Sequence, residues 1–182
     1  MPKSKKYLLK KIVRIELEMF ENVRTTQPSL CKENPRVFRL MREMNHSALS
    51  YDTLKSYLKD LRTAKSKGRN LMIEKYARMN NIIPPLKVNP LIGKIVSIES
   101  DWMNILSNQY PLSINYKPEH FTIYFSCELE TYSDRTIELY LKDIELAKKN
   151  GVSLAKTRFN HLIKQLGYPS LEEFESKREL ET

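Results

Sequence analysis

Apolar residues recur every three or four positions along most of the chain, and this spacing is typical of helices. Near the start it predicts a helix over about 6–24. Pro35 suits a first helical turn, which predicts a second helix over about 35–46. Ser50 is a good N-cap for a third helix, which ends before Gly68, and a fourth follows over about 70–80.

The same pattern returns 83 residues later. Residues 8–76 align with residues 91–159 without a gap, and 19 of the 69 pairs are identical. Average composition gives about 4 identities by chance. The alignment predicts corresponding helices near 90–107, over 118–130, from Ser133 to a point before Gly151, and over about 153–166. The chain is therefore an internal duplication.

Three local features complete this picture. The segment 81–90 contains three prolines and joins the two repeats. Ser170–Glu173 fits a capping box and predicts a final, acidic helix. The stretch FTIYF at 121–125 suits a strand when taken alone, but it aligns with the helical pattern of 38–42, so we expect a helix there.

These elements predict an all-α fold. We expect an internally duplicated helical bundle with about four helices per repeat, an additional C-terminal helix and a pseudo-twofold axis. Each repeat is small enough to be only marginally stable alone. Residues 1–182 should therefore form a single compact domain, made of repeats 8–80 and 91–166, and a ligand site between the repeats is the natural expectation.

Composition narrows the class of protein. Cys31 and Cys127 lie far apart without CxxC spacing, which suits reduced thiols in a cytoplasmic protein. No apolar stretch approaches the roughly 18 residues of a membrane span, and the start lacks the pattern of a signal peptide. We therefore expect a cytoplasmic protein that does not insert into membranes.

The net charge of +9 is shared unevenly between the halves. Residues 1–90 hold 20 Lys and Arg against 8 Asp and Glu, whereas residues 91–182 hold 11 against 14. A basic first half suits phosphorylated or carboxylated ligands, nucleic acid or an acidic partner protein. A solvated helix face explains the same excess equally well.

Several strings in the expected order resemble a known family. They include GRNLMIEKYARM at 68–79 and ELETYS at 128–133. Over about residues 12–145 the chain is similar to a bacterial family described as a domain of unknown function. His46 departs from the family pattern after the MR motif, where aromatic and glutamine residues are usual. The resemblance implies no established activity.

Acidic residues within apolar helix runs are candidates for a buried site. Glu16 and Glu99 stand in such runs, where a carboxylate is costly unless it is paired. Glu18 and Asp101 follow two positions later, so only one acid of each pair can face the core. The Glu-x-x-His pattern of di-iron bundles is missing, and we expect no metal. Asp60 and Asp143, which follow lysines, are expected to form ion pairs at the surface or between helices.

Positions that differ between the repeats are better candidates for function. In the string at 68–79, Arg69 could bind an anion while Glu74 and Tyr76 transfer protons, with Asn70 beside them. An ion-paired network on an exposed helix explains this set equally well. Cys127 has no local base, so we do not expect a nucleophile there.

Arg42 and His46 form another pair, four residues apart, that the second repeat lacks. Arginine can bind a carboxylate or phosphate with two hydrogen bonds, and histidine titrates near neutral pH. A structural role is nevertheless the commoner one for a lone histidine. Glu128 and Glu130 of the second repeat are expected to pair with arginines of the first.

These residues favour a small enzyme that acts on an anionic metabolite between the repeats. The motifs GxGxxG, GxxxxGK[ST], GxSxG and HExxH are missing, so we expect acid–base chemistry without a nucleotide cofactor. A lyase, an isomerase and a hydrolase all remain open. The predicted catalytic residues are Glu74, Tyr76 and His46, and the predicted substrate-binding residues are Arg42, Arg69, Asn70, Glu16, Glu99 and Glu128.

The main alternative is a nucleic-acid-binding or regulatory protein. Lys55, Lys59, Arg62 and Lys65 could follow phosphates along one helix. The helix–Gly–helix segments resemble a helix-turn-helix only loosely, and a generic helical hairpin fits better. An adaptor that docks an acidic partner protein, and a homo-oligomer, also remain open.

Overall fold

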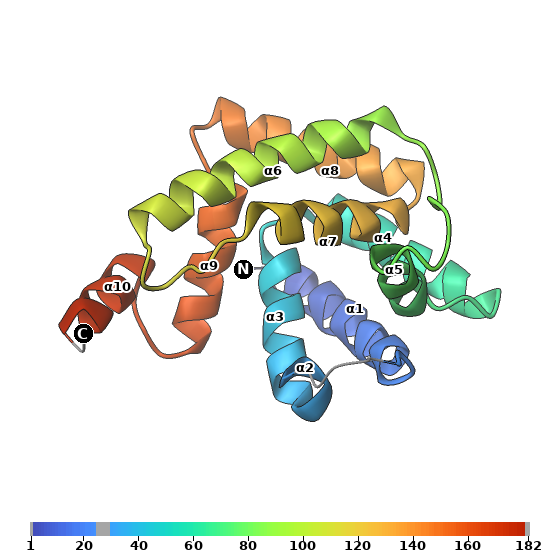
Figure 1. Cartoon of the computed structure of the whole chain (residues 1–182), viewed down its shortest axis with the longest axis horizontal. Helices are drawn as coiled ribbons and strands as arrows, with labels where there is room; N and C mark the ends of the chain where they lie inside the picture. The colour runs from blue at the N-terminus through green and yellow to red at the C-terminus, as the bar shows by residue number, and fades with distance from the viewer. Residues whose placement is uncertain (1, 25–29, 181–182) are drawn as a thin grey trace.

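The structure, a computed structural model, describes residues 2–24 and 30–180 (Figure 1). Within these residues it contains ten helices and no strand. The first half comprises α1 (Lys3–Glu21), α2 (Leu30–Glu33), α3 (Pro35–Ser47), α4 (Tyr51–Ser66) and α5 (Leu71–Met79). The second half comprises α6 (Pro90–Gln109), α7 (Pro118–Glu130), α8 (Asp134–Lys149), α9 (Leu154–Gln165) and α10 (Leu171–Leu180). The all-α prediction is confirmed.

Several helices begin and end where the sequence provides caps. The Ser50 hydroxyl accepts a hydrogen bond from Thr53 N at 3.2 Å, and Ser133 accepts one from Thr136 N at 3.3 Å. Gly68 follows the end of α4 with a φ of 67°, which a residue with a Cβ rarely adopts. The segment 121–125 lies inside α7, so the prediction of a helix there is confirmed.

Two features near the start of the chain differ from the prediction. The first helix covers Lys3–Glu21 rather than 6–24, and the short α2 was not foreseen. From α2, Lys32 Nζ donates hydrogen bonds to the carbonyls of Phe20, Glu21 and Val23 at 2.7–3.0 Å, which satisfies the open end of α1.

The two halves pack through several helix pairs. In Figure 1, α7 runs beside α6 and above α3, while α10 lies at the edge against α9. Across the halves, α3 packs on α9, α4 on α8 and α5 on α7. One hydrophobic cluster contains residues of both halves, including the fully buried Ile12, Leu61, Ile95 and Ile144. None of the described helices is both long and apolar enough to cross a membrane.

Two aspartates hold the crossing of α4 and α8 by binding the start of the opposite helix. Asp143 on α8 accepts hydrogen bonds from Ser50 N at 2.8 Å and from Thr53 Oγ1 at 2.7 Å. Asp60 on α4 accepts them from Ser133 N at 3.0 Å and from Thr136 Oγ1 at 2.6 Å. Within residues 2–24 and 30–180 neither aspartate forms the expected ion pair, and each carboxylate instead accepts from backbone and hydroxyl donors of the other half.

We expect Asp60→Ala and Asp143→Ala each to lower the free energy of unfolding by about 1–3 kcal/mol, the usual cost of leaving buried donors without an acceptor. Urea unfolding followed by circular dichroism measures this loss. Asp101→Ala, an exposed acid on α6, is the matched control and should change stability little. Equal midpoints for the control and for both variants would contradict this account of the crossing.

Candidate functional site

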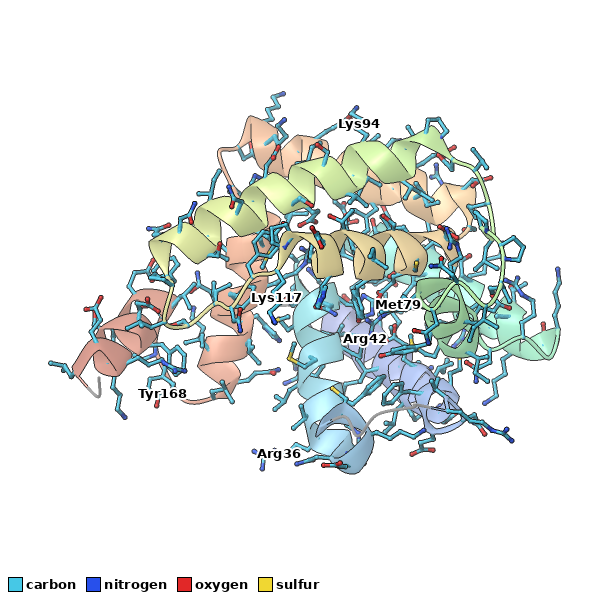
Figure 2. The ribbon with its side chains drawn as sticks, in the orientation of Figure 1. Arg36, Arg42, Met79, Lys94, Lys117 and Tyr168 are labelled. Carbon is cyan, nitrogen blue, oxygen red and sulfur yellow. The ribbon has the colours of Figure 1, made fainter. Side chains whose placement is uncertain are left out.

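A buried arginine connects three helices at the centre of the molecule. Arg42 of α3 donates to Glu16 of α1 from Nε at 3.0 Å and from Nη2 at 2.6 Å. It also donates to Glu128 of α7 from Nη1 at 2.9 Å and from Nη2 at 2.7 Å. Figure 2 labels Arg42 beside α3, below α7. All three side chains are buried, so the guanidinium bridges two carboxylates in the core.

Two further side chains bind Glu16. His46 Nε2 lies 2.9 Å from Glu16 Oε1, and the Tyr57 hydroxyl donates to the same oxygen at 2.8 Å. His46 Nε2 also lies 3.2 Å from Arg42 Nη2. Glu16 thus has partners on α3 and α4, which explains why this acid rather than the exposed Glu18 faces the core.

Glu128 has a second set of partners. Lys75 of α5 donates to Glu128 Oε2 at 2.7 Å, and the hydroxyl of Tyr132 donates to Oε1 at 3.0 Å. The Lys75 ammonium lies 3.4 Å from the centre of the Tyr124 ring, a cation–π contact. The hydroxyl of Tyr124 accepts from Arg42 Nη1 at 3.2 Å. We call these residues the Arg42 cluster: Glu16, Arg42, His46, Tyr57, Lys75, Tyr124, Glu128 and Tyr132.

The charges of the cluster follow from its geometry. Burial acts to raise the pKa of Glu16, but Arg42 and His46 outweigh it and hold this pKa at about 2. Burial likewise opposes ionisation of Glu128, whose pKa Arg42 and Lys75 hold well below its usual value. Burial and the neighbouring Glu16 raise the pKa of Tyr57 well above its usual value. At neutral pH the carboxylates are therefore ionised and the tyrosine is protonated.

A smaller cluster lies in the second half. Arg158 of α9 donates to Glu99 of α6 from Nη1 and Nη2, both at 2.7 Å, and the Tyr140 hydroxyl donates to Glu99 at 2.9 Å. Arg158 Nε also donates to the carbonyl of Asn45 on α3, at 3.1 Å. We call Glu99, Tyr140 and Arg158 the Arg158 cluster. They lie 83 positions after Glu16, Tyr57 and Lys75.

A cavity of about 380 Å³ lies between the two clusters. It is walled by helices of both halves, mainly α3, α7 and α9. Its apolar wall contains methionine and aromatic side chains: Met41, Met44, Met103, Phe121, Phe125 and Phe159. Its polar wall comes from the clusters and from α5: His46, Tyr76, Tyr124, Glu128, Tyr132, Tyr140 and Arg158.

Three groups of the polar wall keep hydrogen-bonding capacity. Within the described residues, His46 Nδ1 and the Tyr76 hydroxyl make no hydrogen bond, and the Tyr124 hydroxyl only accepts one. Burial raises the pKa of Tyr76 and, more strongly, that of Tyr124. Both phenols therefore keep their protons at neutral pH and can donate to a molecule in the cavity.

Cys31 also lines this cavity, and burial raises the pKa of its thiol, as it does that of Cys127. A raised pKa disfavours the thiolate, which is the nucleophilic form. Neither cysteine is therefore a good nucleophile in this structure.

The structure brings together only part of the predicted site. Glu16, Arg42, His46 and Glu128 meet in the Arg42 cluster, and the predicted pairing of Glu128 with Arg42 is present. Glu130 likewise accepts from Arg78 at 3.0 Å. Glu99 lies in the Arg158 cluster, and Tyr76 lines the cavity.

The other predicted residues in α5 and just before it lie apart from the cavity lining. Arg69 donates to Glu74 at 2.6 and 2.8 Å on the outer side of the helix. Asn70 is the N-cap of α5 and accepts from Met72 N and Ile73 N at 3.0 Å. Arg69 and Glu74 match the alternative interpretation, an ion pair on an exposed helix face, because α5 turns Tyr76 rather than Glu74 towards α7.

Four polar residues of the two clusters were not predicted from the sequence: Lys75, Tyr124, Tyr132 and Arg158. One signal could have found two of them, since Lys75 aligns with Arg158, 83 positions later, and both are cations. Tyr57 and Tyr140 also belong to the clusters, since each donates to the carboxylate of its own half.

The donors of the clusters do not form a metal site. Among the described residues, no group of three or more His, Cys, Asp and Glu side chains could hold a metal ion. The guanidinium of Arg42 donates to Glu16 and to Glu128 and so bridges these two carboxylates.

A family model described as "Protein of unknown function (DUF4125)" matches residues 6–176. The chain belongs to this family, and the resemblance found from the motifs is confirmed. None of the curated proteins and none of the solved structures that were compared with the chain matches it.

The lowered pKa of Glu16 predicts acid sensitivity. Its pKa is about 2 in the folded protein and about 4.5 when unfolded, so it stabilises the fold fully above pH 4.5 and loses this effect as the pH falls to 2. The difference corresponds to about 3 kcal/mol. We expect Glu16→Gln to remove this contribution, so that the stability of the variant and of the wild type converge as the pH falls.

Urea unfolding at pH values from 2 to 7 measures this convergence. Asp101→Asn, which changes an exposed acid of α6, is the control and should keep the wild-type pH dependence. If the free energies of unfolding of Glu16→Gln and of the wild type changed with pH in parallel, Glu16 would not have the lowered pKa that its partners in the cluster predict.

Proposed function

We propose that this member of the family binds a small, largely apolar organic molecule in the cavity between the Arg42 and Arg158 clusters, where His46 exchanges a proton with its polar end. The observation that carries the proposal is the cavity itself. Its volume of about 380 Å³ lies in the range of roughly 300–1,000 Å³ for small-molecule sites. An apolar wall with a few polar groups is also typical of such sites.

The charges around the cavity favour an uncharged ligand over a strongly anionic one. The expectation of an anionic metabolite depended on Arg42 and Arg69, and both arginines bind carboxylates of the chain. In the two clusters, the cations of Arg42, Lys75 and Arg158 are matched by the three carboxylates of Glu16, Glu128 and Glu99. The cluster charges thus balance, and the phenols of Tyr76 and Tyr124 suit a carbonyl or hydroxyl oxygen.

His46 is the group best placed for proton transfer. Since Glu16 is ionised, it can only accept a hydrogen bond, so its contact with His46 requires a proton on Nε2. The other ring nitrogen, Nδ1, then carries a lone pair in the neutral imidazole and can take a proton from a ligand. Glu16 fixes the tautomer and orientation of the ring, as carboxylates do for catalytic histidines. Lyase, isomerase and hydrolase reactions that need one such transfer all fit this arrangement.

Internal duplication accounts for the position of the site. We propose that the two repeats form one domain about a pseudo-twofold axis near the crossing of α4 and α8. The reciprocal bonds of Asp60 and Asp143 support this relation, as each donor and acceptor of one set lies 83 positions from its counterpart. The first repeat then differs by His46, which lines the polar wall, and by Arg42, which binds Glu128 of that wall.

A screen of neutral aromatic and aliphatic fragments by ligand-detected nuclear magnetic resonance tests the proposal. We expect some fragments to bind the wild type, and Met41→Trp to weaken their binding at least tenfold, because Met41 lines the cavity and is 38% exposed. Ile105→Trp places the same side chain on an exposed part of α6 outside the cavity lining and should leave binding unchanged.

For the proton transfer, the bound fragments should shift the Nδ1 resonance of ¹⁵N-labelled His46, and His46→Gln should remove that signal without abolishing binding. If no fragment binds, or if the two tryptophan variants bind alike, the cavity is not a ligand site.

A further inference from the structure

A second hollow lies on a different part of the molecule and is strongly basic. It has a volume of about 680 Å³ and is lined by residues of α1, α4 and α8. We call it the basic groove. Its cations are Lys11, Lys55, Lys59, Arg62 and Arg135, and they are accompanied by one acid, Asp52. The groove shares no lining residue with the cavity of the proposed function.

The cations of α4 are available to a ligand. Lys55, Lys59 and Arg62 are exposed and form no ion pair within the described part of the chain. This distinguishes them from nearby Lys65, which binds Glu18 at 2.8 Å. The three positions follow one helix face at i, i+4 and i+7, so they span about 10 Å along the axis. A row of this length can contact more than one phosphate of a chain.

Two exposed aromatic side chains flank these cations. Tyr7 of α1 is 56% exposed and Tyr51 of α4 is 44% exposed, and both line the groove. The Lys11 ammonium lies 4.3 Å from the centre of the Tyr7 ring, and both tyrosine rings keep exposed area on which a further group can stack. Cations that follow a backbone, together with aromatic rings on which bases stack, are the usual elements of single-strand nucleic acid binding.

The second repeat lacks this combination. The positions equivalent to Lys55, Lys59 and Arg62 hold Glu138, Lys142 and Glu145, so two of the three cations are replaced by acids. Tyr7 and Tyr51 correspond to Pro90 and Asp134. The first half of the chain therefore carries both the additional cations and the two tyrosines that line the basic groove.

We infer that the basic groove binds single-stranded nucleic acid, with phosphates on Lys55, Lys59 and Arg62 and bases stacked on Tyr7 and Tyr51. An acidic peptide would use the cations but leave the tyrosines without a flat partner. A duplex also offers its phosphates but keeps its bases stacked on each other. The single strand is the ligand that uses both kinds of side chain.

Fluorescence anisotropy with a labelled oligothymidylate of about 12 nucleotides, titrated at several salt concentrations, tests the inference. Lys55→Gln/Lys59→Gln/Arg62→Gln should weaken binding and reduce the slope of log K against log salt by about 2, since each phosphate contact on a single strand contributes about 0.7. Tyr7→Ala/Tyr51→Ala should weaken binding about tenfold or more and leave the salt slope unchanged, because stacking releases no counterion.

The matched control is Lys148→Gln/Lys149→Gln/Lys164→Gln, which removes the same charge from exposed positions outside the groove. It should bind nearly as the wild type does, and circular dichroism checks that every variant is folded. Equal weakening by both triple variants would overturn the assignment to the groove. Equal binding of a duplex or of polyglutamate, or wild-type affinity of the double tyrosine variant, would overturn the assignment to single strands.

This inference does not depend on the proposed function. Met41→Trp, which should block the cavity, should leave oligonucleotide binding unchanged, so the two sites can fail separately.

Discussion

The structure depends on satisfying a buried positive charge. Arg42 cannot lose its proton, so its burial requires carboxylates, and these come from α1 and from α7, in different halves of the chain. Each carboxylate then needs its own donors, which brings in Tyr57 from α4 and Lys75 from α5. Removing either carboxylate would leave a buried charge without its partner, so this one requirement fixes how five helices meet.

The cavity is a consequence of this arrangement. The Arg42 cluster and the Arg158 cluster are joined through α3, whose Asn45 carbonyl binds Arg158. Side chains held by several hydrogen bonds keep their positions and do not rotate into the space between the clusters. Methionine and aromatic side chains line the remaining wall of the cavity. A site on such fixed side chains needs little rearrangement when a ligand binds.

The sequence predicted what depends on local signals. The positions of α3, α4, α7 and α8 followed from Pro35, Ser50 and their counterparts, because caps act within one helical turn. It could not decide between Glu16 and Glu18, since that choice depends on where α3 places Arg42. The sequence also favoured Arg69 and Glu74 over Lys75. The face of α5 that points inward depends on its packing against α7, which is far away in the sequence.

The central claim is that the Arg42 cluster makes the two halves one cooperative unit. Native-state hydrogen exchange at the slowest amides of α4 and α8 tests it directly, with Arg42→Met as the variant and the exposed Arg36→Met as control. The account predicts that Arg42→Met lowers the opening free energy of both helices equally, by about 3–5 kcal/mol. A fall confined to α4, with α8 protected as in the wild type, would contradict it.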